Sequence, residues 1–177
     1  VDSANGVNGV LQGTQNFNVD SVTGAVGSAL NFDGNLDRVD INALTAPTES
    51  FTLSAWIKPN ELPGEEGEII SLNDDASIRY LRNSNGTSTI RGIVKNNTGA
   101  EQWEELDAQA RLLHDRWNHV AFTWDQTQTP RKMAIYVNGE VVSADKTFDH
   151  VIADFDQLIG AHGKGYNAFV GAIDEVR

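Results

Sequence analysis

"WNHVAFTWDQTQTPRKMAIYVNGEVV", residues 117–142, is the stretch of sequence that decides the fold. From Val120 to Trp124 every second residue is large and apolar, a period of two that is typical of a strand with one buried face. Further on, Asn138-Gly139 follows a second apolar segment, and Asn-Gly supplies the two positive φ angles of a tight hairpin turn. The stretch therefore predicts consecutive antiparallel strands whose apolar stripes fill a core. Its aromatic residues are expected to serve that core.

The same alternation recurs along most of the chain, and helical periodicity is nearly absent. In "FTLSAWIK", residues 51–58, apolar residues take one face of a strand and Trp56 lies on the other. The mixed spacing of residues 100–113 predicts a single helical turn. Many short strands in 177 residues predict an all-β fold, a two-sheet antiparallel β-sandwich of the jelly-roll type. Further strands are expected at about 29–33, 37–41, 67–72, 77–82, 89–95, 157–160 and 168–177.

The composition argues against several classes of function. The net charge is −12 at pH 7, and because nucleic acids attract basic proteins, no nucleic-acid partner is expected. No segment approaches the ~20 apolar residues that a membrane helix needs, so no membrane insertion is expected. The absence of cysteine excludes disulfides and thiolate metal sites. The chain begins without methionine and ends within a strand pattern, so we expect a module cut from a longer protein.

Six segments, taken in order, resemble the laminin-G-like, concanavalin A-like jelly-roll domains of secreted bacterial proteins. The resemblance runs from Asp2 to Arg177 and so implies one domain over residues 1–177, trimmed at its ends, with other domains of the same parent chain as partners. It also implies an extracellular or cell-surface location. The segments are ALNFDGNLDRVDI, FTLSAWIKP, WNHVAFTWD, IYVNG, LIGA and FVGAIDEVR.

The resemblance raises the question of glycoside hydrolysis, because related sandwiches include endoglucanases with a Glu-x-Asp-x-x-Glu strand. Here "ELDAQA" gives Glu105 and Asp107, but Ala110 stands where the proton donor of that pattern belongs. A glycosidase needs both an acid and a second carboxylate at the scissile bond. No nucleophile elbow, phosphate-binding glycine loop or zinc-type histidine spacing is present either. We therefore expect no enzymatic activity.

Calcium is the one cofactor that the sequence favours. Calcium prefers oxygen ligands, and the chain is rich in Asp and Asn. An EF-hand loop starting at Asp33 is excluded, because its glycine position falls on Arg38. Relatives often carry a structural calcium where the N-terminal segments meet the C-terminal strand, and the resemblance implies Asp2, Asn5, Asp33 and Asp174 as ligands. Turn capping by the first two residues and pairing of Asp174 with an arginine remain open alternatives.

A ligand-binding face is suggested by a second hairpin. If Asn85-Gly86 is its centre, Tyr80 lies opposite Arg91, and Arg82 shares their face. An aromatic ring beside basic groups suits a sugar, because the ring stacks on C–H faces while polar groups take the hydroxyls. A purely structural cross-strand Tyr–Arg pair is the alternative. A register slip of one residue would exchange the two faces.

Two further aromatic residues complete the predicted ligand site. Trp103 lies among charged residues without an apolar stripe, and Tyr166 lies in a glycine-rich loop. Together with the hairpin they predict a non-catalytic carbohydrate-binding module whose partner is a polysaccharide or glycan. Two alternatives stay open, a structural or protein-binding module of an adhesin and a polysaccharide hydrolase or lyase with an unrecognised site.

Overall fold

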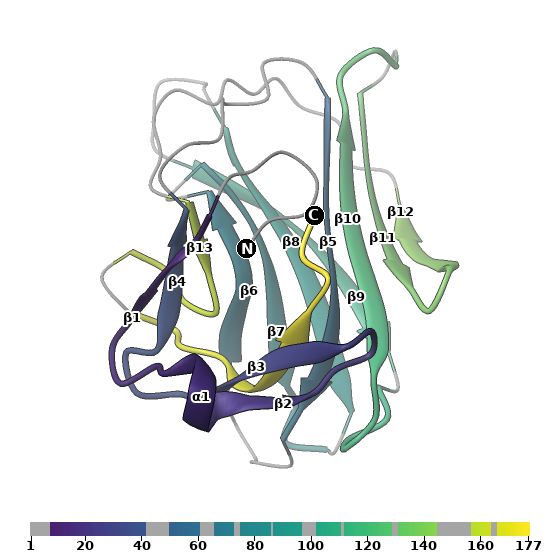
Figure 1. The fold of residues 1–177 in the computed structure, drawn as a ribbon. Helices are drawn as coiled ribbons and strands as arrows, with labels where there is room; N and C mark the ends of the chain where they lie inside the picture. The colour runs from purple at the N-terminus through teal and green to yellow at the C-terminus, as the bar shows by residue number, and fades with distance from the viewer. Residues whose placement is uncertain are drawn as a thin grey trace.

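The structure is a computed structural model that describes residues 8–41, 50–60, 66–72, 75–85, 87–96, 102–110, 112–128, 131–144, 157–163 and 166–177. In this part of the chain the strands form two seven-stranded antiparallel sheets that lie one over the other (Figure 1). The predicted all-β sandwich is confirmed. The described residues contain no helix long and apolar enough to cross a membrane.

The first sheet has the strand order β1-β4-β13-β6-β7-β8-β9, and the second has the order β12-β11-β10-β5-β14-β3-β2. A one-turn helix, α1 (Phe17–Asp20), is capped by the side chain of Asn16. The strands of the first sheet are β1 (Val10–Gln12), β4 (Arg38–Ile41), β13 (Gln157–Ile159), β6 (Glu66–Leu72), β7 (Ala76–Arg82), β8 (Ser88–Asn96) and β9 (Gln102–Ala110). Those of the second are β12 (Glu140–Ala144), β11 (Lys132–Val137), β10 (Asn118–Asp125), β5 (Phe51–Pro59), β14 (Val170–Asp174), β3 (Ser28–Asp33) and β2 (Ser21–Thr23).

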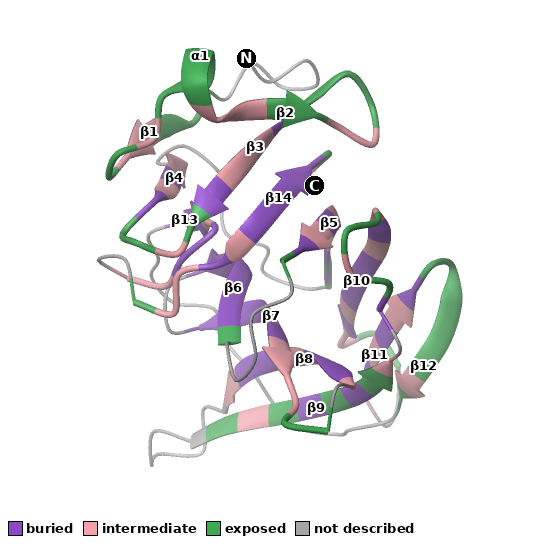
Figure 2. Ribbon diagram, turned by 90° about the horizontal axis from the view of Figure 1, so that it is seen from below, coloured by how far each residue is buried: buried purple, intermediate pink, exposed green. Residues whose placement is uncertain are grey.

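The core lies between the sheets and is filled by the inward-facing residues of the central strands. Phe122 is fully buried, and Trp124 is 2% exposed and packs against Phe51 with ring centroids 5.7 Å apart. Figure 2 shows buried residues concentrated on β6, β7, β10 and β14, whereas β12 is mostly exposed. The predicted tight turn is confirmed, because Asn138 and Gly139 have φ angles of 52° and 85°.

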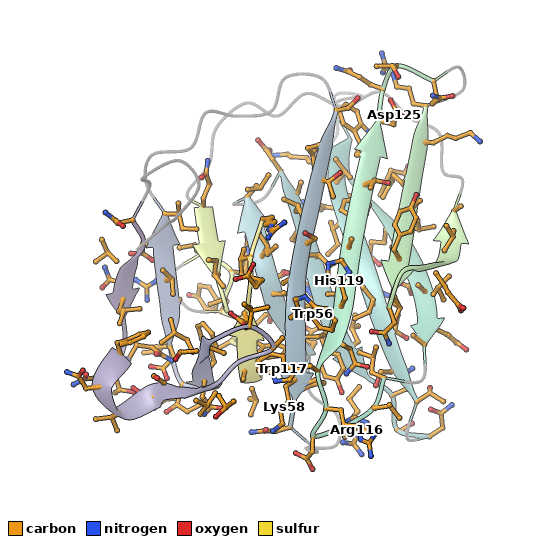
Figure 3. All side chains as sticks on the ribbon, turned by 45° about the vertical axis from the view of Figure 1, so that its right-hand side comes forward. Trp56, Lys58, Arg116, Trp117, His119 and Asp125 are labelled. Carbon is orange, nitrogen blue, oxygen red and sulfur yellow. The ribbon has the colours of Figure 1, made fainter. Side chains whose placement is uncertain are left out.

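The outer face of the second sheet carries an aromatic contact between two neighbouring strands. His119 on β10 lies directly opposite Trp56 on β5, and their ring centroids are 5.3 Å apart at 65°. Figure 3 shows both side chains on the outer face of the sheet, close to Trp117 and Lys58. The prediction that Trp124 fills the core is therefore confirmed, whereas His119 lies on the other face of β10 and forms a cross-strand contact.

The segment predicted as a helical turn is the edge strand β9. It pairs with β8 over nine residues, from Ser88↔Ala110 to Asn96↔Gln102. Leu106 and Ala108 point inward and are buried. The preceding inward position is Glu104, so the apolar stripe of this strand is short and its alternation is weak. Pairing with a neighbouring strand, rather than local propensity, decides the conformation.

The predicted register of the β7–β8 hairpin is wrong by one residue. Tyr80 lies opposite Ile90 rather than Arg91, is 4% exposed, and contacts Phe169 in the core. The loop between the strands spans residues 83–87, and the Asn85 side chain accepts hydrogen bonds from Thr87. A loop with an odd number of residues shifts the register by one and exchanges the faces. Tyr80 is thus a core residue.

Candidate functional site

A polar cavity of about 210 Å³ lies on the outer face of the first sheet. It extends across four neighbouring strands, β6 to β9, and reaches the loop after β13. Burial of a ligand in such a concavity, against a few polar groups and an aromatic ring, is the usual design of a small-molecule site. The lining residues are Glu68, Ala76, Ser77, Arg79, Ile93, Trp103, Glu105 and His162.

Glu68 is the most unusual residue of this cavity, because it is a carboxylate with 0% exposure. Arg79 donates from Nε at 2.9 Å and from Nη2 at 2.5 Å, and both hydrogen bonds go to Oε1. The other oxygen, Oε2, is buried without a hydrogen-bond partner. Burial raises the pKa of the Glu68 carboxyl above its ordinary value of 4.5, while Arg79, His162 and Ser77 oppose the shift.

A β-bulge directs Glu68 toward the outer face. Along β6 the pairing runs Glu68↔Arg79 and then Ile70↔Ile78, so Ile69 is an extra residue with no partner on β7. Without the bulge, Glu68 and Ile70 would share one face of the strand. With it, Glu68 faces outward beside Arg79, and Ile70 points into the core. Bulges often occur next to functional sites for this reason.

The loop after β13 brings His162 to the cavity. His162 Nδ1 is 3.2 Å from the hydroxyl of Ser71 on β6. His162 and Tyr166 exchange two backbone hydrogen bonds of 2.8 Å each, and because directly opposite residues share a face, the two side chains lie on the same side of the loop. Tyr166 is 70% exposed. It therefore lies beside the cavity with its ring accessible.

Trp103 and Glu105 contribute the β9 side of the cavity. Trp103 is 46% exposed and lies opposite Lys95, while Glu105 lies opposite Ile93. Ile93 is buried and lines the cavity between these side chains and β7. An indole with nearly half of its surface open to solvent at the rim of a cavity is suited to stacking on the apolar face of a ligand.

Carboxylates surround the other arginine on this face. Arg91 donates from Nε to Asp107 Oδ1 at 2.6 Å and from Nη2 to Asp107 Oδ2 at 2.9 Å. Its Nη1 lies 2.8 Å from Glu105 Oε2. The hydrogen bonds with Asp107 raise the pKa of Arg91 further above its usual range. Arg91 therefore stays charged, and its donors are directed at the protein's own carboxylates.

The structure brings some of the predicted ligand residues together and separates others. Trp103 lines the cavity, Tyr166 lies in the loop that carries His162, and Arg91 lies on the same outer face. Tyr80 faces the core, and Arg82 follows it on the inward side of β7, so both assignments are corrected. The cause is the one-residue register shift described above.

Sequence reasoning missed Glu68, Arg79 and His162. The signal for the first was present in "EGEIIS", where a charged residue precedes a run of apolar ones. A charge in a buried strand is rarely tolerated unless it is paired. Arg79 is that pair, but only the strand register reveals it. His162 reaches the cavity through a loop, and period-two patterning does not predict the path of a loop.

The described part of the predicted calcium set does not form one site. Asp33 Oδ1 accepts a hydrogen bond from the Asn35 backbone at 2.7 Å, and the two carboxylate oxygens of Asp174 accept from Val26 and Glu175, both at 2.9 Å. Asp33 lies opposite Val170, four residues along β14 from Asp174 and thus roughly 13 Å away.

The remaining two ligands of that set, Asp2 and Asn5, lie outside the described residues. Within the described residues, no group of three or more histidine or carboxylate side chains is arranged to hold a metal ion. Calcium therefore stays a prediction, and Asp33 and Asp174 do not share a cage.

A larger cavity of about 660 Å³ opens between the two sheets. Most of its lining consists of aliphatic and aromatic core residues, among them Phe32, Leu53 and Ile70. These side chains belong to the packing of the sandwich. The polar cavity on the outer face is therefore the better candidate for a functional site.

Comparison with known families shows which family the chain belongs to. The profile of the family Laminin_G_3, described as the concanavalin A-like lectin/glucanases superfamily, matches residues 33–177. The chain therefore belongs to this family, as the sequence resemblance indicated. No curated protein matches the chain at a significant level.

Several solved structures share the fold at low sequence identity. Domain 4 of AbnA, an extracellular GH43 arabinanase from Geobacillus stearothermophilus in complex with arabinotriose, has a TM-score of 0.61 at 20% identity over 89% of this chain and 72% of that chain. The CBM40 domain of Ruminococcus gnavus IT-sialidase bound to α2,3 sialyllactose has a TM-score of 0.56 at 19% identity over 73% of this chain and 74% of that one. Tailspike protein 2 of bacteriophage CBA120 has a TM-score of 0.63 at 14% identity, over 96% of this chain but 27% of the tailspike chain.

Proposed function

We propose that this chain is a non-catalytic carbohydrate-binding module of a larger secreted or cell-surface protein. The observation that carries the proposal is the cavity on the first sheet, where β9 presents the half-open ring of Trp103 and the exposed carboxylate of Glu105 on the same face. Sugars combine apolar C–H faces with hydroxyl groups, and this pairing of an indole with a hydrogen-bond acceptor matches both.

Each residue has a distinct role in this proposal. Trp103 stacks on one face of a sugar ring, and the exposed carboxylate of Glu105 accepts a hydrogen bond from a hydroxyl. His162 and Tyr166 border the sugar from the loop after β13. The site is shallow, so we expect weak binding, on the order of micromolar to millimolar, which corresponds to about 4–8 kcal/mol.

Structural neighbours support a carbohydrate as the ligand class. The AbnA domain was determined with arabinotriose, and the CBM40 domain with sialyllactose. Both are domains of carbohydrate-active enzymes, and the AbnA enzyme is extracellular. Attachment to a catalytic domain of a secreted enzyme is therefore the context that we propose for this module.

Hydrolysis is the second candidate function, and one observation favours it. Glu68, with a raised pKa, and Glu105 both line the cavity, and glycosidases pair a carboxylic acid with a carboxylate across the scissile bond. Glu105 is paired with Arg91, however, and Ala110 stands where the third acid of the endoglucanase strand belongs. Incubation with β-glucans, arabinans and xylans should release no reducing sugar. Release that disappears in Glu68→Gln or Glu105→Gln would establish the enzyme instead.

Calorimetric titration with a panel of oligosaccharides tests the binding function. We expect at least one oligosaccharide to bind, and Trp103→Ala to weaken it about two- to tenfold through loss of stacking. Tyr136→Ala is the matched control, because Tyr136 is a partly exposed aromatic residue on β11 in the second sheet. If no glycan binds at millimolar concentration, the carbohydrate proposal fails and the adhesin alternative takes its place.

A further inference from the structure

We propose that the cavity selects neutral sugars and rejects anionic ones such as uronates, sialates and sulfated sugars. The inference rests on the proposed carbohydrate function and adds the ligand class. It follows from the distribution of charge on the outer face of the first sheet.

Both arginines on this part of the outer face, Arg79 in the cavity lining and Arg91 beside it, are already paired. Arg79 is held by Glu68 and lies 3.5 Å from Glu66 Oε2. Arg91 is held by Asp107 and Glu105, at 2.6 and 2.8 Å. Recognition of an anionic sugar normally uses an arginine whose two donors meet the ligand's carboxylate. Here a ligand anion would have to displace a carboxylate of the protein.

The excess of charge on this surface is negative. Four carboxylates surround the two arginines, and the chain as a whole carries a net charge of −12. Lys95, which lies opposite Trp103, is the other cation near the β9 side. An anionic sugar therefore approaches a surface of like charge, and a repulsive element of this kind creates specificity without any new attractive contact.

The buried carboxylate of Glu68 acts in the same direction. Glu68 lines the cavity and is fully buried, so a carboxylate or sulfate of a ligand would bring a second negative charge close to it, where water screens little.

The test uses pairs of oligosaccharides that differ mainly in charge: lactose against sulfated lactose, and a galactose trimer against a galacturonate trimer. At pH 7.5 and low salt, the neutral member of a pair should bind at least tenfold more tightly. Added salt should lower the neutral-to-anionic affinity ratio, because it screens the repulsion between the ligand anion and the carboxylates of the protein. Equal or tighter binding of the anionic members would overturn the inference while leaving the carbohydrate function intact. Failure of all members to bind would overturn both.

Variants test whether residues of the cavity cause the preference for neutral over anionic sugars. Glu68→Gln removes one negative charge and leaves Arg79 less compensated, so the neutral-to-anionic affinity ratio should fall at least threefold. Glu105→Gln, at the more exposed rim, should change the ratio in the same direction and serves if the first variant does not fold. Glu140→Gln, on the exposed strand β12 of the second sheet, makes the same charge change away from the cavity and should leave the ratio unchanged. An unchanged ratio in both cavity variants would refute the inference.

Discussion

Arg79 donates from Nε and Nη2 to the same oxygen of Glu68, Oε1, and leaves Oε2 without a partner. A bidentate pair would have satisfied both oxygens. The arrangement therefore holds the carboxylate in place through one of its two oxygens. It also makes Glu68 dependent on Arg79, because a buried carboxylate without a cation is strongly destabilising.

Loss of the cation should lower stability markedly. Arg79→Met leaves Glu68 buried and unpaired, and we expect the free energy of unfolding to fall by about 3–5 kcal/mol in urea denaturation. Combining it with Glu68→Leu should recover most of that loss, since an apolar pair needs no charge compensation. Arg177→Met, which removes an exposed pair with Glu175, should change the free energy by less than about 0.5 kcal/mol. A loss below about 1 kcal/mol in Arg79→Met would contradict a buried ion pair.

The raised pKa of Glu68 should be visible in the pH dependence of the free energy of unfolding. Burial raises the pKa of this carboxyl in the folded protein above 4.5, so just above that pH the folded protein holds a proton that the unfolded chain has released. The free energy of unfolding should therefore decrease as pH rises through this window. Glu68→Gln should flatten that part of the curve in urea denaturation series, and Glu140→Gln should not. If the free energy of unfolding changes equally with pH in the wild type, Glu68→Gln and Glu140→Gln, the pKa of Glu68 is not raised.

Contact between the sheets should make Gly92 intolerant of a side chain. A Cβ at this position would lie 2.4 Å from the Phe122 ring, which is fully buried. We expect Gly92→Ala to lower the free energy of unfolding by about 1–3 kcal/mol through overpacking. Gly139→Ala separates this effect from backbone strain, because Gly139 has a φ of 85° but nothing within 4 Å of an added Cβ. Replacing Phe122 with Leu should reduce the loss of unfolding free energy caused by Gly92→Ala, but not the loss caused by Gly139→Ala.

Calcium dependence can be separated from the structural role of Asp174. A bound ion at one hundred times its dissociation constant stabilises the fold by about 2.7 kcal/mol, and we expect excess chelator to lower the Tm. Asp174→Ala should lower the Tm in calcium and in chelator alike, because its carboxylate accepts hydrogen bonds from Val26 and Glu175. Asp2→Ala should remove only the calcium-dependent difference. Superimposable melting curves in calcium and chelator would exclude a stabilising ion.

Period-two alternation was enough to predict the sandwich and much of its core. It placed Val120, Phe122 and Trp124 between the sheets, because every second residue of a half-buried strand must be apolar. It was not enough for β9, where Glu104 takes an inward position and the apolar stripe is short. Pairing with β8 determines that strand, and pairing is not visible in one segment alone.

The candidate site was harder to predict, since it depends on register rather than on pattern. One residue of difference in the loop after Arg82 moved Tyr80 from the predicted ligand face into the core. The bulge at Ile69 turned Glu68 in the opposite direction, toward the surface. Neither feature has a reliable sequence signal, whereas Trp103 was found because an aromatic residue among charges is itself informative.

All lining residues of the cavity except His162 come from one continuous meander, β6 to β9, within residues 66–110. On β7, β8 and β9, alternate residues serve two separate purposes: the inward set packs in the core of the sandwich, and the outward set supplies most of the cavity lining. Specificity can therefore diverge between relatives by exchange of outward side chains alone. The same separation makes this meander a cassette that can be transplanted onto a related sandwich with its inward stripes retained.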